Sequence, residues 1–151
     1  MRELQSFVSP VEWPPLVTAV FSVWLLVMIA VPIVSTRGTR GKVVGISSGV
    51  VFQAALVAVV LIHSWPLPRA LAAIVLVPLL GWFAEFVGSR TGVPFGSYHY
   101  TDQLRPQLLH VPVVIPMAWL MMLPPSWAVA QLLLPNGPMW QHAIVAGLAF
   151  T

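Results

Sequence analysis

Three apolar runs, each about 20 residues long, constrain this chain more than any other feature of its sequence. They cover Leu16–Ser35, Val43–Ile62 and Ala70–Gly88. At 1.5 Å per residue, a helix of that length crosses the ~30 Å hydrocarbon core of a bilayer. Only 7% of the 151 residues are charged and 58% are hydrophobic, whereas a soluble domain carries about 25% charged residues. The sequence therefore predicts an all-α fold, a polytopic transmembrane helical bundle.

A fourth apolar run, Val111–Leu134, is expected to span the membrane as well, although four prolines interrupt it. A fifth run begins near Met139 and reaches Thr151, which leaves about 13 residues, too few to cross a bilayer. We therefore expect one membrane domain, residues 1–151, with four full spans and an incomplete fifth, as in a partial chain. The first 15 residues lack the basic start and the cleavage site of a secretory signal, so the first run is expected to be retained.

The basic residues predict how the bundle is oriented. The link 36–42 and the loop 89–110 together hold Arg37, Arg40, Lys42, Arg90 and Arg105, whereas the opposite side holds only Arg2 and Arg69. Because cytoplasmic loops are enriched in lysine and arginine, we expect both connections to face the cytoplasm of a cell membrane, with the N-terminus outside. No clustered basic face is present, so nucleic acid is not an expected partner.

One carboxylate stands near the end of the third apolar run. Glu85 follows Gly81 and precedes Gly88 at helical spacings, so the three side chains share one face of a helix. Small residues permit close packing, and this face is expected to point into the bundle. A carboxyl group withdrawn from water there favours its neutral form, which can donate a proton. The alternative is that Glu85 reaches the membrane surface or pairs with an arginine of the following loop.

The loop 89–110 holds more glycine, aromatic and titratable residues than a simple connection between helices needs. Its 22 residues are many for a link between helices, and long loops are commonly functional. Gly92 and Gly96 favour turns, and the aromatic content argues against disorder. The alternative for Tyr98 and Tyr100 is an aromatic belt at the membrane surface.

Several kinds of site are not expected. The chain has no cysteine, which excludes disulfides and thiolate metal sites. Its four histidines form neither H-x-x-x-H nor H-E-x-x-H, so we expect no metal. Asp102 is the only aspartate, which argues against an Asp-rich Mg²⁺-diphosphate site. No glycine-rich nucleotide motif is present either, and no cofactor is expected.

Two stretches of the sequence together resemble a known family. They are EFVGSRTGVPFGSYHYTD, Glu85–Asp102, and VPVVIPMAW, Val111–Trp119. Both resemble integral-membrane carotenoid biosynthesis proteins, a group that includes the carotenoid 1,2-hydratases acting on γ-carotene or bisanhydrobacterioruberin. The resemblance covers Trp82–Trp119 and extends to the flanks only by hydropathy. Members are typically longer, with further spans and acidic residues, which again suggests a partial chain.

The resemblance implies a cofactor-independent hydration of the terminal double bond of a linear carotenoid ψ-end, giving a tertiary alcohol. Glu85 or Asp102 would donate the proton, and the other would orient the water. The side chains expected to line the substrate or to stabilise its cation are Trp82, Phe86, Phe95, Tyr98, Tyr100 and Trp119. The residues expected to support the site are Gly92, Gly96, Arg90, Arg105 and His99.

The expected partners are a lipophilic carotenoid that arrives through the bilayer, the bilayer itself, and other membrane enzymes of the carotenoid pathway. The alternative function is that of a non-catalytic carotenoid-binding or scaffold subunit. A transporter or channel is less favoured, because such proteins usually show paired interrupted helices or inverted repeats and none is visible here.

Overall fold

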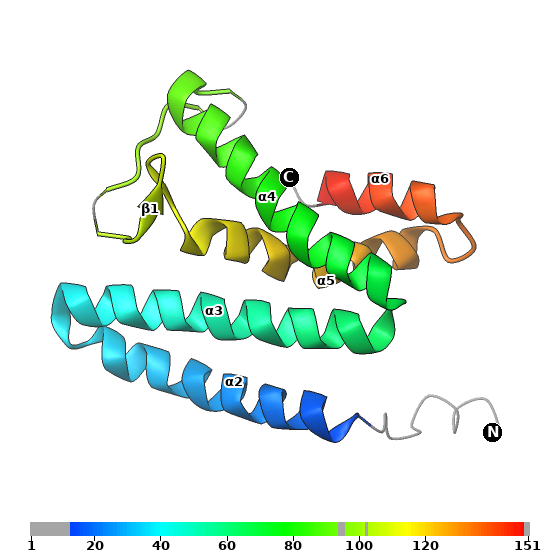
Figure 1. The fold of residues 1–151 in the computed structure, drawn as a ribbon, viewed down its shortest axis with the longest axis horizontal. Helices are drawn as coiled ribbons and strands as arrows, with labels where there is room; N and C mark the ends of the chain where they lie inside the picture. The colour runs from blue at the N-terminus through cyan, green and yellow to red at the C-terminus, as the bar shows by residue number, and fades with distance from the viewer. Residues whose placement is uncertain (1–12, 94–95, 102, 150–151) are drawn as a thin grey trace.

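The computed structural model describes residues 13–93, 96–101 and 103–149. Within these ranges the chain forms a helical bundle with one short β-hairpin at an end (Figure 1). The helices are α2 (Pro15–Ser35), α3 (Gly38–Ser64), α4 (Leu67–Thr91), α5 (Val114–Leu133) and α6 (Met139–Ala149). The antiparallel hairpin pairs β1 (Gln107–Leu108) with β2 (Val111–Pro112).

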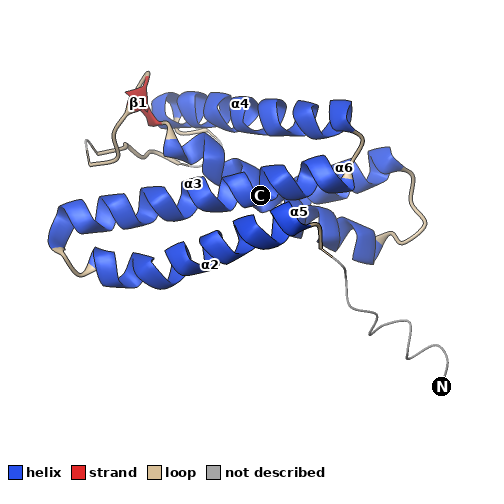
Figure 2. Cartoon of the chain, turned by 60° about the horizontal axis from the view of Figure 1, so that its bottom comes forward, coloured by secondary structure: helices blue, strands red, loops and turns tan. Residues whose placement is uncertain are grey.

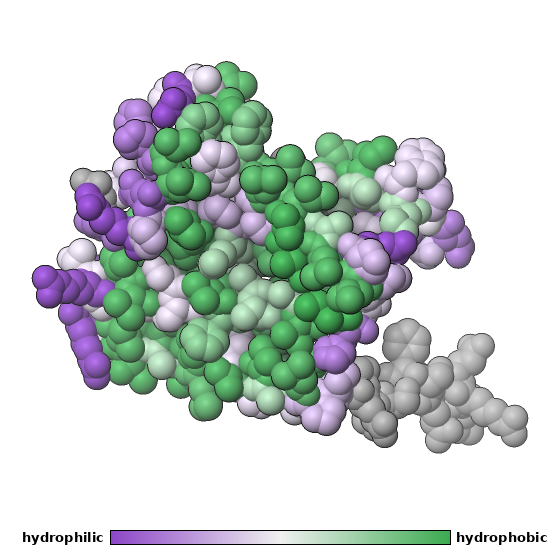
Figure 3. All heavy atoms as spheres, in the orientation of Figure 1, coloured by the Kyte–Doolittle hydropathy of each residue, from purple (hydrophilic) through white to green (hydrophobic). Residues whose placement is uncertain are grey.

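Three of these helices, α2, α3 and α4, are long and apolar enough to cross a membrane. Many large apolar side chains on them face outwards; Leu26 is 67% exposed and Leu80 is 63% exposed. In Figure 3, hydrophobic residues cover the middle of the visible face and hydrophilic ones gather at its left edge. So large an apolar surface is unusual for a soluble monomer and suits contact with lipid. The predicted class of helical membrane protein is confirmed.

The predicted count of four full spans is not confirmed. Helix α5 has 20 residues but is not among the three candidate spans, because its prolines, tryptophans and a glutamine lower its hydropathy. Helix α6 has 11 residues and is too short to cross a bilayer. The start of the fourth apolar run also differs from the prediction, since Val111 and Pro112 form strand β2 and the helix begins at Val114. The all-α prediction missed this hairpin.

Helices α2 and α3 pack closely through three glycines of α3, spaced four residues apart. Gly41, Gly45 and Gly49 are all buried. A Cβ atom on Gly45 would lie 2.8 Å from the Ser35 hydroxyl oxygen, so no larger residue fits there without a shift. This small-residue pattern lets helix backbones approach each other. The connection between the two helices is only Thr36–Arg37, shorter than the predicted link 36–42, because the remaining link residues begin α3.

The buried core lies where α3, α4 and α5 meet. It consists of Ala54, Val57, Leu61, Ala70 and Leu120. About three turns further along α4 from Ala70, Gly81 lies against the indole of Trp119 in α5. The face of α4 that carries Gly81 therefore points into the bundle.

The α2–α3 turn and the hairpin lie at the same end of the bundle in both ribbon views (Figures 1 and 2). This arrangement follows from the up-and-down course of α2, α3 and α4. Which side of the membrane this end faces stays a prediction from the basic residues.

Candidate functional site

The carboxylate of Glu85 accepts hydrogen bonds from three side chains that come from two other segments. The Tyr98 hydroxyl donates to Oε2 at 2.5 Å and the Tyr100 hydroxyl donates to the same oxygen at 2.7 Å. The Trp119 indole N–H, 34 positions along the chain on α5, donates to Oε1 at 3.1 Å. We call these four residues the Glu85 cluster. It links helix α4, the following loop and helix α5.

Two glycines bring the tyrosines back to the helix they follow. Gly92 ends α4 in the left-handed region, with φ of 75°, and its N–H donates to the Gly88 carbonyl at 2.8 Å. Gly96 has φ of 85°, and its N–H donates to the Gly92 carbonyl at 2.7 Å. Glycine adopts such conformations without the steric cost that other residues meet. The chain therefore reverses direction tightly and returns along the last turns of α4.

The two phenols of the cluster are held in their protonated form. Burial, together with the hydrogen bond to Glu85 and the negative charge of that carboxylate, raises the pKa of Tyr98 to about 12. The pKa of Tyr100 is raised still more. Burial is the largest cause, and the hydrogen bond to Glu85 and the charge of its carboxylate add to it. The two rings meet edge to face, with centroids 5.5 Å apart. At neutral pH both phenols therefore remain hydrogen-bond donors.

The arginines of the loop take other positions. The guanidinium carbon of Arg90 lies 4.3 Å from the centroid of the Phe86 ring, a cation–π contact. Phe86 is in turn stacked on Trp82, with centroids 5.4 Å apart. Arg105 precedes Pro106 through a cis peptide bond, just before β1. Among the described residues, the side chains that donate to the Glu85 carboxylate are thus aromatic and not cationic.

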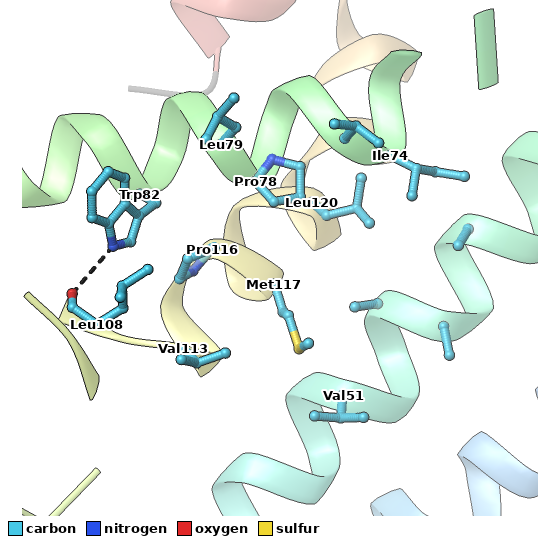
Figure 4. Close-up of a pocket in the computed structure, with 14 residues that line it drawn as sticks. Val51, Ile74, Pro78, Leu79, Trp82, Leu108, Val113, Pro116, Met117 and Leu120 are labelled. Carbon is cyan, nitrogen blue, oxygen red and sulfur yellow. Dashed lines mark hydrogen bonds between the residues drawn. The ribbon is translucent and has the colours of Figure 1, made fainter. Parts of the chain in front are cut away.

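An apolar cavity of about 690 Å³ lies between α3, α4, α5 and the hairpin (Figure 4). Trp82 and Leu108 form one side of it, joined by a hydrogen bond of 3.3 Å from the indole N–H to the Leu108 carbonyl. Every lining residue is apolar. They are Val51, Ala54, Ala55, Ala58, Ile74, Val75, Pro78, Leu79, Trp82, Leu108, Val113, Pro116, Met117 and Leu120.

A second cavity, of about 410 Å³, has the opposite character. It is lined by Ser89, Arg90, His99, Tyr100 and His110, and we call it the polar recess. Tyr100 belongs both to this recess and to the Glu85 cluster. Trp82, which lines the apolar cavity, lies three residues before Glu85 and hence on the same side of α4. Through Tyr100 the Glu85 cluster adjoins the cavity suited to water, and Trp82, three residues before Glu85, lines the cavity suited to hydrocarbon.

The structure brings together Glu85, Tyr98, Tyr100 and Trp119, and places Trp82 and Phe86 beside them. Phe95 and Asp102 lie outside the described residues. His99 and Arg90 line the polar recess. Within the described ranges, no three histidine or acidic side chains are grouped as metal ligands.

Sequence reasoning missed the part of the apolar cavity that α3 contributes. Ala54, Ala55 and Ala58 line it, and they are spaced so that they share one helix face. This run of small residues was the available signal. It also missed Ser89 as a residue of the polar recess, since a serine at a helix end has many ordinary roles.

Comparison with known proteins gives one match. A family model described as "Carotenoid biosynthesis protein" matches residues 45–151. The matched range includes α4, the loop, the Glu85 cluster and both cavities, and it excludes α2. No curated protein and no solved structure matches the chain.

Proposed function

This chain belongs to the family of carotenoid biosynthesis proteins, and from that premise we propose that it adds water to the terminal double bond of a linear carotenoid ψ-end. The observation that carries the proposal is the position of the Glu85 cluster. An acid held by aromatic donors shares Tyr100 with the polar recess and follows Trp82 of the apolar cavity by three residues.

The apolar cavity supplies a place for the end of a polyene that comes from the bilayer. Val51, Val75 and Leu79 line the cavity and are also 44%, 61% and 55% exposed. They lie on α3 and α4, both candidate membrane spans. A hydrocarbon can therefore pass sideways from lipid into the cavity without crossing water, which avoids a hydration cost for its apolar surface.

The proposed reaction begins with proton transfer. The Glu85 carboxylate first takes up a proton and then gives that proton to the less substituted carbon of the terminal double bond. The π electrons form the new C–H bond and leave a tertiary cation. The three hydrogen bonds to the carboxylate stabilise the anion that remains, and the indole face of Trp82 in the cavity attracts the cation.

Water then completes the addition. A water molecule from the polar recess attacks the tertiary carbon, and its surplus proton returns to the Glu85 carboxylate. The net change is one water added to one double bond, with no oxidant or reductant. Tyr100 lies where the water would arrive, because it lines the recess and contacts Glu85. Asp102, two residues further along, is the second acid that we propose for orienting the water.

The test is expression of the protein in a host that accumulates linear carotenoids, followed by chromatography and mass spectrometry of the pigments. Glutamine at position 85 keeps the shape of the side chain but has no carboxyl proton to donate. Loss of a general acid typically costs 10²–10⁴-fold in rate, so Glu85→Gln should reduce the hydrated product by about a hundredfold or more. The variant must reach the membrane at the wild-type level. Unchanged hydration in this variant would exclude Glu85 as the proton donor.

The second candidate function is carotenoid binding without chemistry. It is favoured by the lining of the apolar cavity, which contains no ionisable side chain. In that case the Glu85 cluster would serve as a link between α4, the loop and α5. The same experiment separates the two, because a binding subunit would retain pigment of unchanged mass in both the wild type and Glu85→Gln.

A further inference from the structure

We infer that the polar recess binds the phosphate group of an anionic phospholipid. This inference concerns a different ligand from the carotenoid, and its test does not measure hydration. It places the phosphate in the same recess that we propose as the source of the water.

The recess gathers hydrogen-bond donors that the rest of the described structure leaves without acceptors. The Ser89 hydroxyl already donates to the Phe86 carbonyl at 3.3 Å, and the Tyr100 hydroxyl donates to Glu85. The remaining lining side chains are Arg90, His99 and His110, all of them exposed. Within the described part of the chain, none of these three makes a side-chain hydrogen bond. Three donors therefore face one space of about 410 Å³.

The charge around the recess favours an anion. Glu85 is the only acidic residue in the part of the chain that the structure describes. Its carboxylate is covered by Tyr98, Tyr100 and Trp119. The basic residues of the α2–α3 turn lie at the same end of the bundle (Figure 1). By sequence, the link 36–42 and the loop 89–110 together hold five basic residues against one acid, Asp102, so an anion at this end meets net positive charge.

Arg90 is suited to a phosphate in particular. Its guanidinium lies over the Phe86 ring, which orders the side chain and leaves the N–H groups at the edge of the guanidinium plane available. That fork matches two oxygens of a phosphate. The histidines approach from other parts of the chain, His99 from the loop and His110 from the hairpin turn, where its φ is 73°.

The surface of α4 indicates that the phosphate belongs to a lipid. Leu76, Leu79 and Phe83 precede Arg90 at spacings that place all four on one helix face. The three apolar side chains are 51%, 55% and 57% exposed. From Leu76 to Arg90 this stripe runs about 21 Å, more than half of the ~30 Å hydrocarbon thickness. An acyl chain along the stripe would place its headgroup at the recess, whereas a free phosphate would gain nothing from the stripe.

The test is native mass spectrometry of the full chain purified in detergent with equal amounts of phosphatidylglycerol and phosphatidylcholine. We expect the wild type to retain phosphatidylglycerol in preference to phosphatidylcholine, and excess inorganic phosphate not to displace it. Loss of a charge-assisted hydrogen-bond donor should weaken retention in Arg90→Gln by about tenfold. Lys42→Gln is the matched control, because Lys42 is a basic residue at the same end of the bundle but outside the recess.

A second variant, His99→Gln with His110→Gln, tests the recess without changing α4. Circular dichroism checks that each variant keeps its helix content. Weaker retention in this variant supports the site even if Arg90→Gln misfolds. Three results would overturn the inference. They are equal retention of the two lipids, equal losses in Lys42→Gln and the recess variants, and displacement of the lipid by inorganic phosphate.

Discussion

Replacing Gly81 by alanine should destabilise the bundle by forcing α4 away from α5. A Cβ atom at this position would lie 2.5 Å from Cγ of Trp119 and 2.8 Å from its Cβ and Cδ2. Real Cβ contacts are not this short, so either the indole or a helix must move. Because Trp119 also donates to Glu85, the displacement would lengthen or break one hydrogen bond of the Glu85 cluster.

The size of the effect follows from two opposing contributions. Alanine in place of glycine within a helix gains about 0.8–1 kcal/mol of helix propensity. Overpacking a tight contact costs about 1–3 kcal/mol. Gly147 of α6 offers a matched control, since a Cβ there would meet nothing within 4 Å. Gly81→Ala should therefore be less stable than Gly147→Ala by about 1–3 kcal/mol, the overpacking cost alone.

The assay is unfolding of the purified protein in detergent, followed by far-ultraviolet circular dichroism. A double-mutant cycle tests the named contact, because Trp119→Ala removes most of the atoms that the new methyl group would meet. In that background, Gly81→Ala should cost much less. Equal stability of Gly81→Ala and Gly147→Ala would refute the close packing of α4 on α5 at this point.

Two further predictions concern the site. Tyr98 and Tyr100 are the only tyrosines of the chain, so the rise in absorbance near 295 nm with pH, over the constant absorbance of the tryptophans, reports their ionisation. Because their pKa values are raised, phenolate should form above the ordinary value of about 10. The unfolded chain gives up these protons first, so the contribution of Tyr98 to stability should be lost as the pH rises from about 10 to about 12, and that of Tyr100 over a range that extends higher. A transition near pH 10 in the folded protein would contradict the contacts with Glu85. Filling the apolar cavity by Ala58→Phe should reduce bound carotenoid several-fold. The control Ala72→Phe should not, because Ala72 is an exposed residue of α4 outside the cavity. Equal amounts of bound pigment in the two variants would show that carotenoid binds elsewhere.

Local sequence patterns predicted the parts of the site that depend on neighbouring residues. The spacing of Gly81, Glu85 and Gly88 placed them on one helix face, and Gly81 and Gly88 are indeed buried in the bundle. The glycines of the loop indicated turns, and Gly92 and Gly96 have positive φ. Such features follow from the backbone preferences of single residues and from the 3.6-residue period.

Other parts could not be predicted in this way, because they require segments far apart in the sequence. Nothing near Trp119 in the sequence indicates that its indole donates to Glu85, 34 positions earlier. The hairpin consists of two strands of two residues each, too short for an alternating pattern. The fourth predicted span is not confirmed, since α5 is not among the candidate spans, and the prediction gave the length of the apolar run more weight than the prolines within it.

The sequence by itself determined that the chain forms long apolar helices suited to a bilayer, because length and hydropathy alone decide whether a helix can satisfy its backbone in lipid. It also determined the family, through residues that lie close together along the chain. Only the tertiary structure decided what surrounds Glu85, and that an apolar cavity lined by Trp82 and a polar recess lined by Tyr100 form beside it. A cavity is a property of packing between helices, and it exists only once α3, α4, α5 and the hairpin have taken their places.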